Sequence, residues 1–182
     1  MVNIVVIGEE RYHVDVGFGT NCPIQPLKLD SSGLEYQHIH PGTMRLQWRN
    51  IDANTNPNQR LWVYEHKKDE QSEFQQTYCF TELEFLPSDY SLMSYFTSTN
   101  PRTFFTYRVM CERKLFDVDH QIAGNVVLTD KFKWRRKGDE NIDHNLTDEE
   151  DRTTHLEKYF GIRFTSIERD SIRGLVSELK SA

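Results

Sequence analysis

The first residues of the chain, Met1–Gly19, read MVNIVVIGEERYHVDVGFG and decide how the fold begins. Val2–Ile7 is an apolar, mostly β-branched run that predicts a buried strand, and Gly8–Glu10 is a tight connection. Arg11–Val16 follows as a second strand, so the stretch predicts a β-hairpin. Because its apolar face needs a covering surface, we expect that surface to lie in chain that precedes Met1.

Further strand-like runs follow the hairpin and are separated by polar, turn-rich stretches. They are Leu34–His40, Thr43–Trp48, Arg60–His66 and Gln75–Leu86. Several short strands at fairly regular spacing favour an antiparallel barrel or a strongly twisted sheet. The sequence therefore predicts an antiparallel β-barrel-like domain over residues 1–86.

The remainder of the chain mixes helices and strands. A helix is predicted from Pro87 to about Phe96, capped by Ser88 or Asp89, and a capping box at Thr147–Glu150 begins another that Gly161 ends. The predicted strands are Phe104–Glu112, His120–Thr129 and Phe132–Arg136, and Ser166–Leu179 is predicted as a last amphipathic helix. The fold class predicted is mixed α+β, with an α/β lid domain and C-terminal helices over residues 87–182.

Composition excludes several classes of protein. The 182 residues are 37% hydrophobic, 27% charged and 12% aromatic, with a net charge of -6, which is typical of a folded chain with a polar surface. No apolar run approaches the ~18 residues of a membrane helix, and the N-terminus lacks the features of a secretory signal. A pI near 5.6 argues against nucleic-acid binding. We expect a cytoplasmic protein that binds neither nucleic acid nor membrane.

The chain has three cysteines, Cys22, Cys79 and Cys111, without a C-x-x-C spacing. This pattern favours reduced thiols over a disulfide scaffold or a zinc site. His38 and His40 alternate along one predicted strand, but two ligands without a nearby carboxylate or thiolate favour exposed strand histidines. We therefore expect no metal. The basic run Lys131–Lys137 is interpreted as a solvated edge strand, and two tryptophans, Trp48 and Trp62, are interpreted as core residues.

Asp15 is the most informative residue of the hairpin. A carboxylate in an otherwise apolar strand either faces solvent or is held by a partner, because a lone buried charge is costly. Spacing alone favours an exposed strand residue before a turn. Gly17 and Gly19 flank Phe18, and glycines in such positions let the backbone approach a ligand closely.

Two stretches carry a resemblance to a known family. Tyr12–Gly19, with Asn3–Val5 before it and Pro26–Leu27 after it, resembles the signature Y-x-V-D-V-G-F-G of the arylamine N-acetyltransferase family, in its fungal-type form. Tyr95–Phe105 is similar to the family segment that ends S-T-S-P-x-S-x-F. The resemblance covers the whole chain and implies the second and third domains of a cysteine-proteinase-like fold.

The resemblance implies acyl transfer from acetyl-coenzyme A, or another acyl-coenzyme A, to an aromatic amine or hydrazine. In the family, a cysteine takes the acyl group, a histidine activates the cysteine and an aspartate orients the histidine. Asp15 matches that aspartate. Phe18 would line the acceptor pocket and Phe105 would form its opposite wall, while the coenzyme A access would lie near three residues, Pro101, Arg102 and Thr103.

The sequence departs from the family at the other two catalytic positions. The family histidine lies roughly fifteen residues before the aspartate, as an orienting carboxylate requires, and this places it just before Met1. The family cysteine lies further upstream, in an R-G-G-x-C context that is absent here. His13 shares a strand face with Asp15, but none of the three cysteines is a good nucleophile. We expect a chain that is inactive alone, with an exposed hairpin and Asp15 face through which it associates with another chain.

A second class of function stays open at this point. A chain without the cysteine and the histidine is also compatible with a non-catalytic module that binds coenzyme A or an aromatic ligand, or with a half that pairs with a separate helical partner.

Overall fold

The structure, a computed structural model, describes residues 1–180 and groups into two compact units. The first unit is Met1–Glu84, and the second begins at Phe85. The sequence predicts two domains that divide between residues 86 and 87, and whether each unit folds as an independent domain stays a prediction. None of the helices described is both long enough and apolar enough to cross a membrane.

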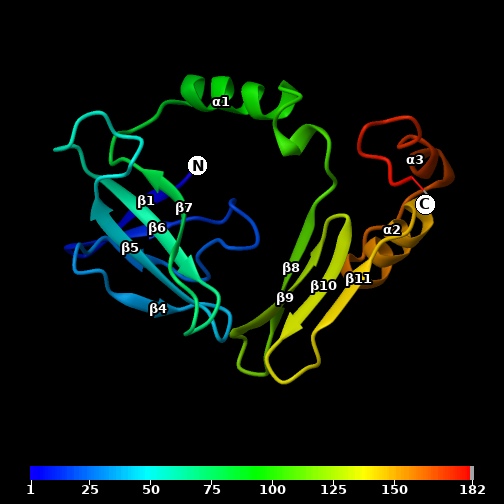
Figure 1. Ribbon diagram of the computed structural model, residues 1–182, viewed down its shortest axis with the longest axis horizontal. Helices are drawn as coiled ribbons and strands as arrows, with labels where there is room; N and C mark the ends of the chain where they lie inside the picture. The colour runs from blue at the N-terminus through cyan, green and yellow to red at the C-terminus, as the bar shows by residue number, and fades with distance from the viewer. Residues whose placement is uncertain (181–182) are drawn as a thin grey trace. The chain divides into compact units, whose positions relative to one another are not determined.

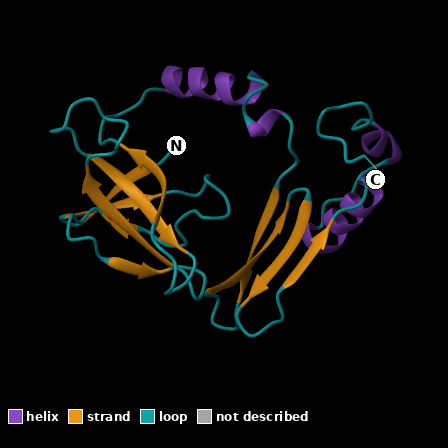
Figure 2. Cartoon of the chain, viewed as in Figure 1, coloured by secondary structure: helices purple, strands orange, loops and turns teal. Residues whose placement is uncertain are grey.

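The first unit contains two antiparallel sheets (Figures 1 and 2). The smaller sheet has the order β1-β2-β3 and the larger has the order β4-β5-β6-β7. The bounds are β1 Asn3–Ile7, β2 Glu10–Val14, β3 Leu27–Lys28, β4 Glu35–Gln37, β5 Thr43–Arg49, β6 Leu61–Lys67 and β7 Gln75–Phe80. Among the described residues no pairing closes these sheets into a barrel. Because β3 is only two residues long, it cannot extend a ladder far enough to close one.

The predicted hairpin is confirmed, with Asn3 paired to Val14 and Ile7 paired to Glu10. Gly8 occupies the turn with a positive φ of 63°. The prediction that the first strand is buried is wrong, because β1 lies at the edge of its sheet and Val6 is 64% exposed. The hairpin therefore carries the exposed apolar surface expected from the sequence.

The core of the first unit lies between the two sheets. Leu27 of β3 packs in one cluster with residues of β5 and β6, namely Met44, Leu46, Trp62 and Tyr64. Strand β6 is buried from Leu61 to Glu65 because it lies between β5 and β7. The buried Glu65 carboxylate accepts from Arg45 Nε at 2.8 Å and Arg49 Nη2 at 2.6 Å, so its charge is paired.

The second unit contains one antiparallel sheet with the order β11-β10-β9-β8 and a set of helices (Figures 1 and 2). The strands are β8 Cys111–Phe116, β9 Ile122–Leu128, β10 Lys131–Arg136 and β11 Ile142–Asn145. The helices are α1 Pro87–Thr99, the 3-10 turn η1 Phe104–Thr106, α2 Glu149–His155, its π-helical continuation η2 Leu156–Phe160 and α3 Ser166–Asp170. The sheets of both units are antiparallel, and helices accompany the sheet of the second unit. The mixed α+β fold class is therefore confirmed.

Several predicted bounds in the second unit differ from those observed. The strand expected from Phe104 begins at Cys111, because Phe104–Thr106 forms a helical turn. The last helix ends at Asp170 instead of Leu179, since turns follow and Gly174 has a positive φ of 79°. Helix α1 begins after Leu86, whose backbone N–H donates to the Asp89 carboxylate at 2.8 Å.

The core of the second unit joins the sheet to the C-terminal helices. It contains Leu115, Val126, Leu128, Phe132, Leu146 and Leu156. Asp148, within the predicted capping box, caps α2 by accepting the Asp151 backbone N–H at 2.9 Å. Arg152 is buried one turn later and donates to the Ser177 carbonyl at 2.9 Å, so the end of the described chain is fastened to α2.

Gly124→Ala should lower the free energy of unfolding by about 1–3 kcal/mol, as expected for an overpacked site. A Cβ at Gly124 would lie 2.1 Å from the Arg135 carbonyl oxygen, on the paired strand β10. Gly17→Ala is the control, because its Cβ would lie 3.9 Å from the nearest atom reported, Asp15 Oδ1. Denaturant titration of both variants checks this, and an equal loss in the two would contradict it.

Candidate functional site

Asp15 follows directly after β2 and is only 7% exposed. Its Oδ1 accepts the backbone N–H of Gly17 at 2.8 Å, in a turn that folds the chain back onto the carboxylate. The expectation from spacing that Asp15 is an exposed strand residue is therefore wrong. The chain itself buries this carboxylate and satisfies part of its hydrogen-bonding capacity.

His13 lies beside Asp15, as their alternation along one strand face predicts. The imidazole is fully buried and stacks on Phe80 with ring centroids 4.7 Å apart. Its Nε2 lies 3.0 Å from the Tyr78 hydroxyl of β7. A hydrogen bond therefore links the smaller sheet to the larger one next to Asp15.

The direction of this hydrogen bond follows from what surrounds it. His13 Nδ1 is buried without a partner, and an unpaired N–H there would cost more than an unpaired lone pair. We therefore assign the proton of His13 to Nε2, which donates to the Tyr78 hydroxyl. Asp15 acts on the same tyrosine, because its side chain raises the pKa of Tyr78.

Burial controls the ionisation of the groups in this network. It lowers the pKa of His13 to about 4, although the neighbouring Asp15 acts in the opposite direction. Burial also raises the pKa of Tyr78, and a hydrogen bond to Asp15 raises it further. Near neutral pH, His13 and Tyr78 are both uncharged.

The cysteines and the other histidines have different surroundings. Cys22 is buried near the network, and its thiol lies 3.2 Å from the Pro23 carbonyl and 3.7 Å from the Asp15 backbone carbonyl. Burial raises the pKa of Cys111. The interpretation of His38 as an exposed strand residue is wrong: it is buried after β4 ends at Gln37, with Nε2 3.0 Å from the Cys22 carbonyl.

Phe18 is the predicted acceptor-pocket residue and stands at the edge of the network. Its ring centroid lies 4.9 Å from that of Tyr78, and the side chain is 48% exposed. Gly19 follows with a positive φ of 97°, in the turn where Cys22 N–H donates to the Gly19 carbonyl. The first unit thus brings an exposed aromatic face and a buried carboxylate to the same region.

The predicted coenzyme A residues lie at the C-terminal end of α1, in the second unit. The Thr103 hydroxyl is within 2.7 Å of the Thr97 carbonyl and 2.8 Å of the Asn100 carbonyl, so it fastens the end of the helix. Arg102 is exposed, and its backbone N–H donates to the Asn100 side chain at 2.9 Å. Among the described residues, no hydrogen bond or ion pair involves its guanidinium.

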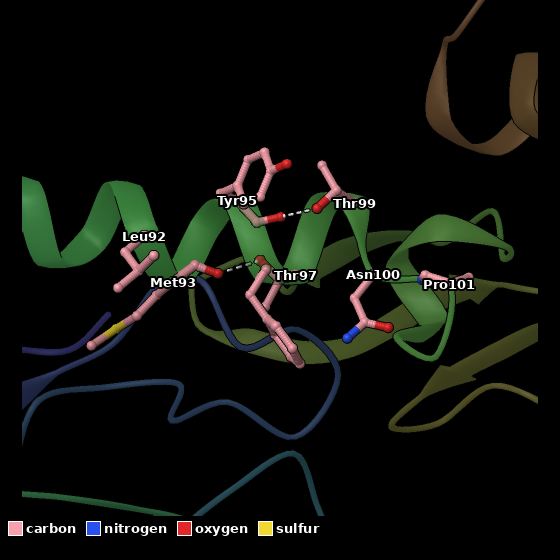
Figure 3. Close-up of a pocket in the computed structure, with 8 residues that line it drawn as sticks. Leu92, Met93, Tyr95, Thr97, Thr99, Asn100 and Pro101 are labelled. Carbon is pink, nitrogen blue, oxygen red and sulfur yellow. Dashed lines mark hydrogen bonds between the residues drawn. The ribbon is translucent and has the colours of Figure 1, made fainter.

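An open groove of about 780 Å³ runs along the C-terminal half of α1 (Figure 3). It is lined by Leu92, Met93, Tyr95, Phe96, Thr97, Thr99, Asn100 and Pro101. Pro101 is the predicted site residue that borders it. The predicted pocket residue Phe105 is exposed in η1, and its ring centroid lies 4.1 Å from that of Phe104.

The structure thus gathers the sequence-predicted site residues in two sets, one in each unit. Asp15 and Phe18 belong to the first, and the predicted coenzyme A residues belong to the second with Phe105. Sequence reasoning missed Tyr78, although its alternation with Phe80 along β7 marks an inward face. Trp62 is buried as predicted, but Trp48 is exposed.

The free energy of unfolding should fall as the pH drops from about 6.5 to about 4, by up to about 3 kcal/mol. In this window His13 is protonated in the unfolded chain but neutral in the folded one, among Asp15, Tyr64 and Tyr78. Denaturant titrations between about pH 7 and pH 4.5 measure the slope. His13→Gln should flatten it and His120→Asn, at an exposed histidine, should not; an unchanged slope in His13→Gln would refute the assignment.

A family model and two curated relatives match the sequence of this chain. A family model described as N-acetyltransferase matches residues 1–169. An N-malonyltransferase of Gibberella moniliformis is 36% identical over 181 residues, covering 94% of this chain and 52% of the relative. An N-malonyltransferase of Fusarium pseudograminearum is 37% identical over 182 residues, covering 94% and 53%. The chain spans about half the length of these relatives.

Solved structures agree with this placement. The arylamine N-acetyltransferase of Salmonella typhimurium matches with a TM-score of 0.74 at 22% identity, over 94% of this chain and 59% of that one. The Mycobacterium marinum arylamine N-acetyltransferase in complex with coenzyme A matches with a TM-score of 0.68 at 25% identity, over 88% and 53%. On the family model, the relatives and the shared fold together, the chain belongs to the arylamine N-acetyltransferase family.

Proposed function

We propose that this protein takes part in the transfer of an acyl group from an acyl-coenzyme A to an aromatic amine, with Asp15 as the carboxylate of a Cys-His-Asp triad. The buried position of Asp15 at the end of β2 carries the proposal. Its carboxylate accepts the Gly17 N–H and raises the pKa of the nearby Tyr78, and it keeps acceptor capacity for a further strong donor. In the proposal that donor is the imidazole of the triad histidine.

A carboxylate in this setting can perform the orienting role. It holds the incoming imidazole in one tautomer and stabilises the imidazolium that forms when the cysteine is deprotonated. The thiolate then attacks the acyl thioester, coenzyme A leaves as its thiol, and the amine takes the acyl group from the cysteine. The fixed hydrogen bonds of Asp15 supply the preorganisation that this role requires.

The other proposed contacts divide between binding the acceptor and binding the cofactor. Phe18 offers an exposed ring to an aromatic amine, and Phe105 offers a second one. The residues present fit coenzyme A at the end of α1, because Arg102 presents an exposed guanidinium that can pair with a phosphate. Pro101 and Thr103 hold the backbone at the C-terminal end of α1. Coenzyme A would supply the activated thioester.

The acyl group is proposed as malonyl or acetyl. The curated relatives, at 36–37% identity, are N-malonyltransferases, which favours malonyl. The matched solved structures, at lower identity, are arylamine N-acetyltransferases. Both donors therefore enter each of the following tests.

Purified chain of residues 1–182 should show no acyl transfer from acetyl- or malonyl-coenzyme A to an arylamine. The physical reason is that a triad acts as a unit, and Asp15 is the triad position to which the family signature matches in residues 1–182. The measurement is release of free coenzyme A, and intact-mass analysis checks for an acyl adduct. Turnover that Cys22→Ala, Cys79→Ala or Cys111→Ala abolishes would overturn the expectation.

Asp15→Asn should slow cysteine acylation by about three to four orders of magnitude in a completed enzyme. A chimera supplies a cysteine and a histidine by joining the part of the Gibberella moniliformis relative outside the matched region to residues 1–182. The asparagine keeps the shape but removes the charge that stabilises the imidazolium. Stopped-flow acylation with each donor measures the effect.

The control for this chimera is Asp52→Asn, the same change at an exposed loop position of the first unit. It should acylate at the unmodified rate. If Asp15→Asn acylates as fast as Asp52→Asn, Asp15 is not the triad carboxylate.

A further inference from the structure

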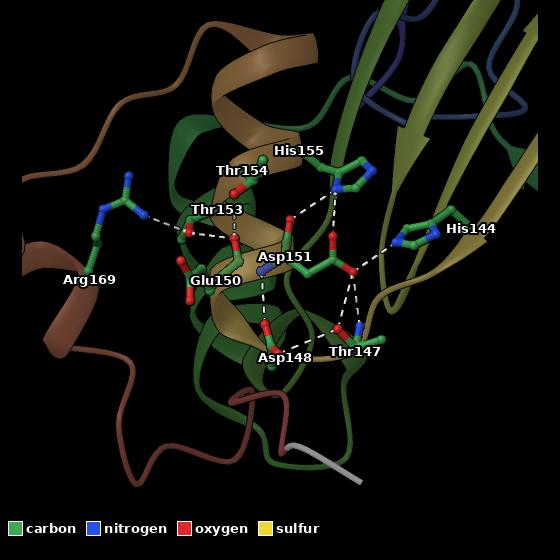
Figure 4. Close-up of polar contacts among 9 residues, drawn as sticks. All are labelled: His144, Thr147, Asp148, Glu150, Asp151, Thr153, Thr154, His155 and Arg169. Atoms are coloured by element: carbon green, nitrogen blue, oxygen red, sulfur yellow. Dashed lines mark hydrogen bonds and ion pairs between the residues drawn. The ribbon is translucent and has the colours of Figure 1, made fainter.

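Three side chains of the second unit converge outside the proposed acyl-transfer site. His144 lies on β11, and Asp151 and His155 lie one helical turn apart on α2 (Figure 4). The spacing of four residues places the last two on one face of the helix. The sheet and the helix thus present two imidazoles and one carboxylate to each other.

The donor atoms already surround a common point. His144 Nε2 lies 2.8 Å from Asp151 Oδ2, and His155 Nδ1 lies 3.0 Å from Asp151 Oδ1. One ligand atom from each residue lies within 4.8 Å of the others. The two imidazole rings stack with centroids 4.9 Å apart and an interplanar angle of 14°, so both nitrogens face the carboxylate from the same side.

The two nitrogen–oxygen separations are close to those of a tetrahedral transition-metal site. Zinc binds imidazole nitrogen and carboxylate oxygen at about 2.0–2.2 Å, which places neighbouring ligand atoms about 3.3 Å apart. The nitrogen–oxygen pairs need to open by only a few tenths of an ångström to admit an ion. Each neutral imidazole then moves its proton to its other ring nitrogen, and its lone pair faces the metal.

The ligands are held in place by contacts outside the cluster. The Thr147 backbone N–H donates to Asp151 Oδ2 at 3.1 Å and orients the carboxylate. The ring of His155 packs on Phe132 and Tyr159, with centroids 4.8 and 5.6 Å away. Such supporting contacts fix ligand orientation in metal sites.

The chemistry of the set selects a class of ion. Two imidazoles favour zinc and its neighbours over magnesium or calcium, which prefer oxygen ligands. The side chains of His144, Asp151 and His155 are 43%, 20% and 17% exposed, so an ion can enter and water can complete its coordination.

We propose that His144 Nε2, His155 Nδ1 and the Asp151 carboxylate bind a divalent transition-metal ion of the zinc class and thereby tie β11 to α2. The site stands apart from the proposed acyl transfer, since none of its residues has a role there. Its test accordingly reads metal binding and stability, and not activity.

The experiment uses tag-free, chelator-treated protein of the full chain. Zn²⁺ is titrated by calorimetry, and Co²⁺ is titrated by visible absorption. The expected result is one saturable site per chain and a rise in the thermal midpoint with Zn²⁺. His144→Phe keeps the ring stack without a ligand nitrogen, and Asp151→Asn keeps the Thr147 contact without the charge; both should weaken binding at least tenfold.

The matched control is His120→Asn, which removes an exposed imidazole from a turn of the same unit. Its φ of 58° is one that asparagine tolerates, so the backbone should be unaffected. This variant should bind Zn²⁺ like the unmodified chain. Far-ultraviolet circular dichroism checks that each variant is folded.

A second test uses the unmodified chain, so its result does not depend on whether the variants fold. Zn²⁺ should protect His144 and His155, but not His120, from diethyl pyrocarbonate, as peptide mass analysis reports. The proposal is overturned if no saturable binding occurs, if His144→Phe binds like His120→Asn, or if cobalt gives thiolate charge-transfer absorption. The first outcome would leave the cluster as a hydrogen-bonded contact between β11 and α2.

Discussion

The burial of the Asp15 carboxylate is the constraint on which the first unit depends. A charge removed from water must be satisfied by fixed donors, and the Gly17 N–H is one of them; the carboxylate also raises the pKa of Tyr78. Tyr78 also contacts His13, 65 residues earlier in the sequence. The Tyr78 hydroxyl therefore joins β2 to β7, so the smaller sheet is held to the larger one by polar contacts as well as by the apolar cluster around Leu27.

Local features of the fold could be predicted from the sequence where the signal was itself local. The hairpin follows from the apolar run and the Gly8 turn, and α2 begins within the predicted stretch Thr147–Glu150, although Asp148 caps it and not Thr147. Strand β11, Ile142–Asn145, was not predicted, because four exposed residues show no alternation and pair only when β10 is present. The burial of Asp15 was not predictable either, because it depends on a tyrosine from a distant strand.

The histidines show that spacing in the sequence does not by itself predict which side chains lie together. His38 and His40 attract attention because they alternate in sequence, yet His38 is buried after its strand has ended. His144 and His155 look unrelated in sequence, yet the sheet and the helix stack their rings. Sequence spacing did contain part of the second signal, in the four-residue interval between Asp151 and His155. The third residue of the cluster, His144, lies on β11, a strand that was not predicted from the sequence.

Exposed apolar surface and the proposed chemistry meet at the end of β2. Val16 is 89% exposed one residue after the buried Asp15, and Phe18 is about half exposed. Whatever covers this surface removes water from beside the carboxylate, and a lower local dielectric strengthens its interaction with an imidazolium. We expect that the surface that supplies the histidine also covers Val16, because acyl transfer needs both the imidazole and a site that excludes water. In the proposed enzyme, the surface that covers Val16 therefore also brings the histidine to Asp15.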